Sequence, residues 1–225
     1  MKDKILFLSA LFLLNVLMGF SQNNERILGR STSNLKAPSE KAVPAYDKGV
    51  DHAGKKEYSL AVPNYELAIA IDSDYIDAYN NLGLAFFELG SLDSAAYYLQ
   101  ISLHKLPTGT TALQNLALVE EKKDNLPKAL GYYKQIAVIE PESPEGYYNS
   151  GRVLATMAKF DEALAQALRA EKLYAKSNSP YTSDCLYLIF AIYYNMQNKP
   201  MAKKYMALCK KENVSIPADM ESALQ

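Results

Sequence analysis

Two glycines stand at equivalent places in two similar stretches, and this repetition limits the folds open to the chain. The stretch from Tyr79 to Gly90, YNNLGLAFFELG, has apolar residues at helical spacing and Gly83 in its middle. A second stretch, YYNSGRVLATMA, begins at Tyr147 and carries Gly151 at the same place, 68 residues or two periods of 34 further on. Glycine costs a helix interior about 1 kcal/mol relative to alanine. A helical glycine that recurs at this period therefore predicts an array of small helical units.

The period of 34 residues extends through most of the chain. With Ile76 as position 1, Tyr79 is position 4, Leu82 and Gly83 are positions 7 and 8, and Pro107 is position 32. A fifth unit, from Ser183, needs five extra residues around SNSPY. Alanine recurs at position 20 of all five units: Ala61, Ala95, Ala129, Ala163 and Ala202. This spaced pattern of aromatic, Leu-Gly, aromatic, Ala and Pro residues resembles the tetratricopeptide repeat (TPR).

The resemblance implies an all-α fold, a right-handed superhelical solenoid of about five helix-turn-helix units with a short C-terminal capping helix. The small residues at positions 8 and 20 are expected to let the two helices of a unit pack closely. Phe190 at position 8 of the fifth unit and Pro63 inside the second helix of the first unit depart from the pattern. The expected TPR domain covers residues 44–225, with units near 42–75, 76–109, 110–143, 144–177 and 183–216 and a cap at 217–225.

The N-terminal residues are typical of an export signal. A short basic segment, MKDK, precedes 16 residues that are apolar apart from Ser9 and Asn15, and small residues precede a cleavage point after Ser21. We therefore predict a signal peptide at 1–21, a flexible polar spacer at 22–43 and an exported location, periplasmic or secreted. The ending FSQ resembles signal peptides of exported Bacteroidota proteins. An uncleaved membrane anchor is the alternative, although the apolar run is shorter than the ~20 residues of a spanning helix.

The two cysteines are predicted to lie on the two antiparallel helices of the fifth unit. Cys185 and Cys209 occupy positions 3 and 27 of that unit. In an exported protein a disulfide between them would persist. Two small buried thiols are the other reading of the same pattern, and both readings stay open.

The sequence holds no pattern of a catalytic, cofactor or metal site, so we predict no enzyme, no cofactor and no metal. The two histidines, His52 and His104, are 52 residues apart and lack metal-ligand spacing, and His52 stands at a packing position. Phosphate-binding glycine loops and the GxSxG nucleophile motif are missing from the sequence. A formal net charge of -1 gives no reason to expect a nucleic-acid partner.

The resemblance to TPR proteins places a ligand groove on the first helix of each unit, at positions 2, 5, 6, 9, 12 and 13. Position 6 holds an asparagine in three successive units, Asn81, Asn115 and Asn149, and amides both donate to and accept from a peptide backbone. These residues are either a ladder for an extended chain or simply part of the family consensus. The other groove candidates are Asn80, Leu84, Phe87, Gln114, Leu118, Tyr148, Arg152, Tyr187 and Tyr194.

Charges at the same positions lean acidic. The carboxylates are Asp47, Asp77, Glu88, Glu121, Glu145 and Asp184, against Lys122 and Arg152. They favour a basic or neutral partner, and a solvated helix face is the alternative. TPR domains that clamp a C-terminal carboxylate use Lys and Arg at positions 2, 5 and 6, which this sequence lacks.

The expected function is a protein- or peptide-binding scaffold or adaptor in the bacterial periplasm or cell envelope. A structural subunit of an envelope or outer-membrane assembly, joined through its convex face or spacer, is the second hypothesis, and an enzyme is the third. Membrane association is expected only through an uncleaved signal sequence. Neither the partner nor the oligomeric state follows from the residues.

Overall fold

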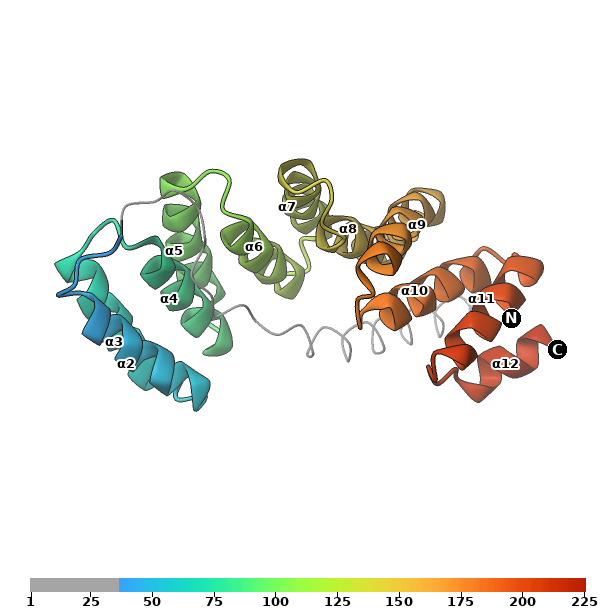
Figure 1. The fold of residues 1–225 in the computed structure, drawn as a ribbon, viewed down its shortest axis with the longest axis horizontal. Coiled ribbons are helices and arrows are strands. Elements are labelled where there is room, and N and C mark those ends of the chain that lie inside the picture. The colour runs from blue at the N-terminus through green and yellow to red at the C-terminus, as the bar shows by residue number, and fades with distance from the viewer. Residues whose placement is uncertain (1–36) are drawn as a thin grey trace. The chain divides into compact units, whose positions relative to one another are not determined.

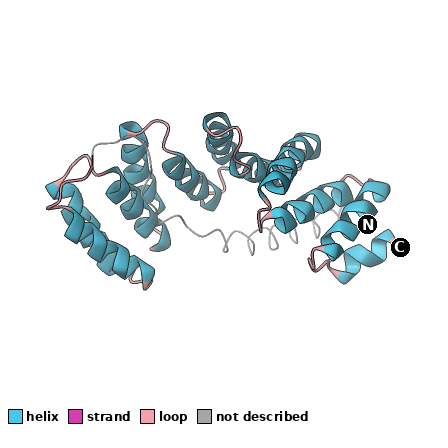
Figure 2. Ribbon diagram, in the orientation of Figure 1, coloured by secondary structure: helices cyan, strands magenta, loops and turns pink. Residues whose placement is uncertain are grey.

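The computed structural model describes residues 37–225, which form eleven helices, α2 to α12, and no strand (Figures 1 and 2). The predicted signal peptide and most of the predicted spacer lie outside these residues. The chain divides at Ile139 into two compact units, whose described parts are 37–139 and 140–225. Each unit is described by itself below.

Unit 37–139 consists of three helical hairpins. Each helix packs on the next one along the chain, and the first helices of successive hairpins also contact one another directly. The hairpins are α2 (Val43–Gly54) with α3 (Tyr58–Ile71), α4 (Ile76–Glu88) with α5 (Leu92–Lys105), and α6 (Thr110–Lys122) with α7 (Leu126–Ile139).

Unit 140–225 consists of two hairpins and a short terminal helix. In it α8 packs on α9, α9 and α8 both contact α10, and α12 packs on α11. The elements are α8 (Glu145–Thr156), α9 (Phe160–Ser177), α10 (Thr182–Asn195), α11 (Lys199–Lys211) and α12 (Ala218–Leu224). The predicted fold class, helical hairpin repeats followed by a short last helix, is confirmed.

The repeated glycines lie where the two helices of a hairpin come closest. A Cβ placed on Gly83 would lie 2.6 Å from the Leu99 Cγ and 3.2 Å from the Ala95 carbonyl oxygen. A Cβ on Gly151 would lie 3.2 Å from the Ala163 carbonyl oxygen. All five alanines at position 20 are completely buried. The close approach predicted from small residues is confirmed, and at Gly83 the Leu99 side chain occupies the nearest space.

The turn inside each hairpin has one residue in the left-handed region, always at position 15 of the repeat. Gly90 holds this place in the second hairpin, with φ of +77°. In the other four hairpins the residue has a side chain: Lys56, Asp124, Ala158 and Gln197, with φ between 57° and 61°. The helix that follows begins two residues later, so Asp93, Pro127, Asp161 and Pro200 are the second residues of their helices. Acidic residues and proline are both favoured there.

Pro63 lies inside α3, which runs unbroken from Tyr58 to Ile71. Proline has no N–H, so the backbone bond that would reach the Ser59 carbonyl in the first turn cannot form. The helix is held instead by its packing, since Ala61, Tyr65 and Ala68 on the same helix are all completely buried.

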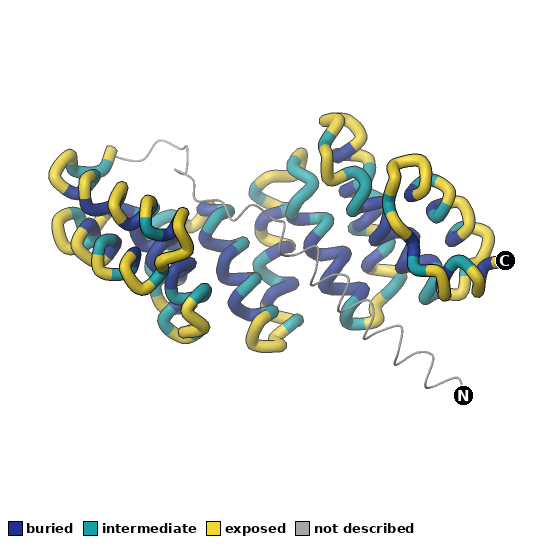
Figure 3. The backbone as a smooth tube through the Cα atoms, turned by 90° about the horizontal axis from the view of Figure 1, so that it is seen from below, coloured by how far each residue is buried: buried dark blue, intermediate teal, exposed yellow. Residues whose placement is uncertain are grey.

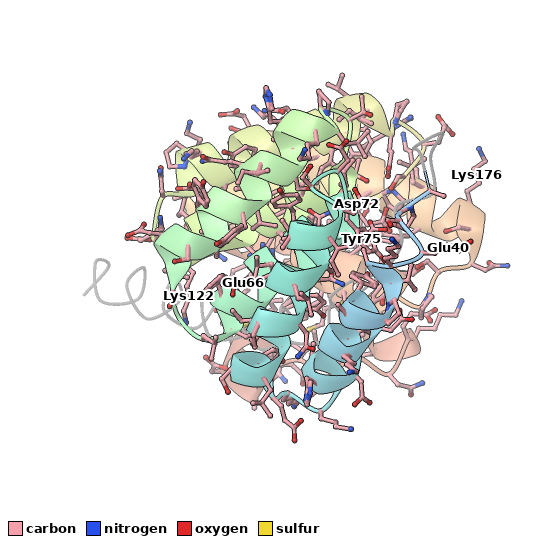
Figure 4. All side chains as sticks on the ribbon, turned by 90° about the vertical axis from the view of Figure 1, so that its left-hand side faces the viewer. Glu40, Glu66, Asp72, Tyr75, Lys122 and Lys176 are labelled. Carbon is pink, nitrogen blue, oxygen red and sulfur yellow. The ribbon has the colours of Figure 1, made fainter. Side chains whose placement is uncertain are left out.

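The start of α2 is tied to the turn between α3 and α4. The Ser39 N–H donates to Asp72 Oδ2 at 2.7 Å, and the Tyr46 and Tyr75 rings are in contact, tilted by 32° with centroids 4.7 Å apart. Figure 4 labels Glu40, Asp72 and Tyr75 at this end of the first hairpin. These two contacts join the start of the first hairpin to the end of its second helix and the residues that follow.

Burial follows the packing of the hairpins. Buried positions gather in the middle of the helices, and the turns are exposed (Figure 3). Among residues 37–225, none of the helices combines the length and apolarity needed to cross a bilayer.

Candidate functional site

The groove candidates all lie on the first helices of the hairpins. The groove face is the side of these first helices that carries repeat positions 2, 5, 6, 9, 12 and 13. In unit 37–139 it belongs to α2, α4 and α6, and in unit 140–225 to α8 and α10. Seven of the twelve candidates are buried, namely Asn80, Asn81, Leu84, Asn115, Asn149, Arg152 and Tyr187. The other five are half-buried. Because direct contacts join neighbouring first helices within each unit, their side chains form a continuous face in each unit.

Asn81 ties two repeats together. Its Nδ2 donates to the Tyr46 hydroxyl at 2.9 Å, in a buried hydrogen bond between α4 and α2. Burial raises the pKa of Tyr46 far above its usual value, so the hydroxyl stays protonated. Asn81 therefore has a structural partner inside the unit, which the expectation of a free amide ladder did not include.

Asn80, the neighbouring residue, has an acceptor without a donor. It is 4% exposed, and its Oδ1 has no hydrogen-bond partner. A buried polar atom left without a partner costs about 1–3 kcal/mol. An N–H group of a bound chain would remove that cost, so Asn80 is a stronger binding candidate than Asn81.

A buried carboxylate on α6 was missed as a functional or structural centre by sequence reasoning. Glu120 is 3% exposed and accepts from Lys128 Nζ at 2.7 Å and from Asn125 Nδ2 at 3.0 Å. The hydrogen bond with Glu120 raises the pKa of Lys128. Glu120 occupies position 11, where the pattern has an aromatic residue, and this substitution is the signal that could have revealed it. The network joins α6 to the start of α7 and so organises that hairpin.

On α8, Tyr148, Asn149 and Arg152 share one stripe with Glu145. Asn149 Nδ2 donates to the Glu145 carbonyl at 3.1 Å, while Asn149 Oδ1 has no partner although the residue is 4% exposed. The bond made by the nitrogen also identifies which end of the amide is the oxygen. Burial raises the pKa of Tyr148, and the nearby Arg152, which is 7% exposed, offsets a smaller part of that rise.

Three tyrosines and two carboxylates meet where α8 and α10 begin. The Tyr148 and Tyr174 rings lie 6.0 Å apart between centroids, nearly edge to face, and Tyr174 lies 6.3 Å from Tyr181. Burial and then Glu145 raise the pKa of Tyr174, with a smaller contribution from Asp184. Burial also raises the pKa of the half-buried Asp184 carboxyl. Of this group only Tyr148 was among the groove candidates.

Tyr187 and Tyr194 lie toward the C-terminal end, on either side of the Phe190 ring, at 5.8 Å and 6.1 Å between centroids. Phe190 is completely buried, although the repeat pattern has a small residue at its position. Burial raises the pKa of Tyr187 to about 12, and Asp219 of α12 adds to this. The last short helix therefore contributes charge beside these two candidates.

Both cysteines are buried free thiols in the structure. The Cys185 thiol donates to the Ala167 carbonyl on α9 at 3.4 Å, a contact between the fourth and fifth hairpins. Burial raises the pKa of Cys185 strongly and that of Cys209 to about 12. Of the two readings of the sequence, the structure has the thiols rather than the disulfide.

The histidines lie apart from the groove candidates. His52 Nδ1 is 2.8 Å from Glu57 Oε2, in the turn between α2 and α3, and His104 is exposed near the end of α5. Within residues 37–225, no three His, Cys, Asp or Glu side chains come together as a metal site would need.

Comparison with known protein sequences finds the TPR repeat. The family model for the TPR repeat matches residues 54–90, which span α3 and α4. Subunit 3 of the anaphase-promoting complex of Schizosaccharomyces pombe is 22% identical over 161 residues, 72% of this chain and 24% of that protein. The ycf37 protein of Guillardia theta is 29% identical over 40% of this chain and 54% of its own length. The chain thus spans between a quarter and just over half of these relatives.

Solved structures share the fold at low sequence identity. MamA from Desulfovibrio magneticus RS-1 aligns with a TM-score of 0.69 and 14% identity over 79% of this chain and 97% of that one. PilF of Pseudomonas aeruginosa aligns with a TM-score of 0.69 and 16% identity over 82% of each chain. YrrB, described as a TPR protein with an unusual peptide-binding site, aligns with a TM-score of 0.61 and 20% identity over 76% of this chain and 86% of its own. The chain thus contains a match to the TPR repeat at residues 54–90 and shares the helical-hairpin fold of these solved TPR structures.

Proposed function

We propose that the protein is a scaffold that binds an extended protein segment on its groove face, within the bacterial periplasm or cell envelope. The fold supports this, because repeat arrays present extended binding surfaces built from successive helices. YrrB, which shares the fold, is described as having a peptide-binding site. The observation that carries the proposal is a pair of buried acceptors on the groove face, Asn80 Oδ1 and Asn149 Oδ1, that no donor satisfies. A peptide backbone supplies N–H donors of the required kind.

The location rests on the sequence. The basic start, the apolar run and the small residues before Ser21 are the features of an export signal. Expression of the full sequence in a bacterial host with an envelope tests this. N-terminal sequencing of the protein from the periplasmic fraction should begin at Gln22, and protein retained in the cytoplasm with Met1 intact would contradict it.

Binding is tested by capture from an envelope extract with the purified protein and with an Asn80→Ala/Asn149→Ala variant. We expect the captured partners to decrease by about tenfold, because each lost amide contact contributes about 0.5–1.5 kcal/mol. Asn64→Ala is the matched control, since Asn64 lies on α3, away from the groove face, and bonds only its own helix at Leu60. Equal capture by all three proteins would place binding elsewhere.

A second candidate, a structural subunit, is favoured by an apolar outer face on α3. Leu60, Leu67 and Ile71 are 51%, 53% and 42% exposed, and they recur on one side of the helix. Replacement of Leu60 and Leu67 by Gln should abolish self-association or assembly in light scattering if this face is used. A wild-type protein that is strictly monomeric at high concentration counts against self-association through it.

A further inference from the structure

The start of the groove face in unit 140–225 has a charge without a counter-charge. Asp184, in the first turn of α10, is half-buried, and its carboxylate has no hydrogen bond or ion pair with any residue in 37–225. Glu145, in the first turn of α8, accepts a hydrogen bond from the Ser143 hydroxyl and lies close to Tyr174. With Arg152 counted against these two carboxylates, the local formal charge is about -1. A partner that restores neutrality carries a positive charge.

A second observation points the same way. Asn149, on the same stripe of α8 as Glu145 and Tyr148, is 4% exposed and presents an oxygen with no donor. The Asp184 carboxylate and Asn149 Oδ1 are thus both hydrogen-bond acceptors to which no donor in residues 37–225 is bonded. An anionic ligand would bring further acceptors to this place, whereas an ammonium or guanidinium group brings several donors.

Aromatic rings line the same place. Tyr148 and Tyr174 are nearly perpendicular, at 74°, and Tyr181 beside them is 37% exposed. The face of an aromatic ring attracts a cation within about 6 Å of its centroid, more strongly where water is excluded. Unit 37–139 differs at the position of Tyr148, where its first helices carry the amides Asn80 and Gln114 in place of an aromatic ring.

We propose that the face formed by Tyr148, Asn149 and Asp184 binds the side chain of a lysine or arginine in the extended partner segment. This inference rests on the proposed function and adds the chemistry of one subsite to it. Asp184 is the counter-charge, Asn149 Oδ1 is an acceptor, and the Tyr148 ring is the wall against which the aliphatic stem and the cation lie.

The test uses the protein produced from the full sequence and four pools of nonapeptides. The peptides are acetylated and amidated at their ends and random except at the centre, which is Lys, Arg, Met or Glu. Fluorescence anisotropy should show the Lys and Arg pools binding about tenfold more tightly than the Met pool, which corresponds to about 1.4 kcal/mol. The preference should shrink between about 50 and 500 mM salt as the charge pair is screened.

The variant Asp184→Asn should bind the Lys, Arg and Met pools equally, with the affinity for the Met pool unchanged. Asp184→Lys should shift the preference to the Glu pool. Glu162→Gln, an exposed carboxylate in the first turn of α9, is the control that should keep the wild-type preference. Circular dichroism confirms that each variant is folded.

The outcomes separate the two levels of the proposal. Equal binding of all pools by the wild-type protein, or a preference that survives in Asp184→Asn, overturns the cation subsite and leaves peptide binding standing. Failure of every pool to bind the wild-type protein overturns both the subsite and the groove function on which it rests.

Discussion

At the scale of single residues, the glycines of the repeat differ in what surrounds them. Gly83→Ala brings a methyl group against Leu99 and the Ala95 carbonyl, whereas Gly131→Ala, inside α7, meets no atom within 4 Å. Overpacking costs about 1–3 kcal/mol, and alanine gains about 1 kcal/mol over glycine in an open helix. We expect urea unfolding to show Gly83→Ala destabilised and Gly131→Ala stabilised. Equal effects of the two substitutions on the free energy of unfolding would mean that helix propensity alone determines the change in stability.

The thiols give a second residue-scale prediction. Burial holds both cysteines protonated at neutral pH by raising the pKa of each, and the thiolate is the reactive form. Native protein at pH 8 should therefore react with a thiol reagent far more slowly than a free cysteine. Unreduced protein in denaturant should titrate two thiols, and a count of zero would show that a disulfide forms.

Asp184 gives a prediction that depends on pH. Burial raises its pKa above the unfolded value near 3.8, so the folded state disfavours the charged form. The contribution of Asp184 to the free energy of unfolding is therefore fully present below pH 3.8, and it is lost as the pH rises through the pKa of Asp184 in the folded state. Asp184→Asn should therefore raise the melting temperature at pH 7 and have little effect near pH 3.5. The rise should be small, because the N-terminus of α10 favours a negative charge. A lower melting temperature at pH 7 would indicate a stabilising contact of the carboxylate.

At the scale of elements, the turns inside the hairpins store strain that the repeat pattern does not show. Ala158 has φ of 57° in the turn between α8 and α9, where Gly90 stands in the second hairpin. A left-handed conformation costs a residue with a side chain about 1–2 kcal/mol, and the greater freedom of glycine in the unfolded chain offsets part of the gain. Ala158→Gly should stabilise the protein by about 0.5–1 kcal/mol in thermal or urea unfolding.

The reciprocal substitution is the control for this prediction. Gly90→Ala meets no atom within 4 Å, so any destabilisation reports backbone strain alone. If Ala158→Gly destabilises while Gly90→Ala is neutral, the strain argument fails.

At the scale of the whole molecule, each unit has its own buried core. In unit 37–139 the core includes Tyr65, Leu82 and Leu99, and in unit 140–225 it includes Leu154 and Phe190, all fully buried. Stability in repeat proteins is a sum of local terms between neighbouring repeats. Hydrogen exchange of Gly83→Ala should therefore accelerate in residues 37–139 and stay unchanged in 140–225. Equal acceleration in both would show that the chain unfolds as one cooperative unit.

Much of the fold follows from the sequence alone. The period of 34 and the five alanines at position 20 predict helical hairpins, and Asp93, Pro127, Asp161 and Pro200, which also recur with the repeat, agree with the helix starts. The site follows less well. The repeat pattern places Asn81 and Asn149 equivalently, yet Asn81 bonds Tyr46 while Asn149 Oδ1 has no partner.

The sequence by itself determined the repeat, the helices and the close contact at Gly83, since these depend on local spacing and on side-chain size. Only the tertiary structure decided which polar groups are satisfied. Whether an amide or carboxylate has a partner depends on groups brought together across repeats, as with Asn81 and Tyr46, or left without one, as with Asp184. Equivalent positions in a repeat share a backbone environment, and their polar partners come from neighbours that are not equivalent.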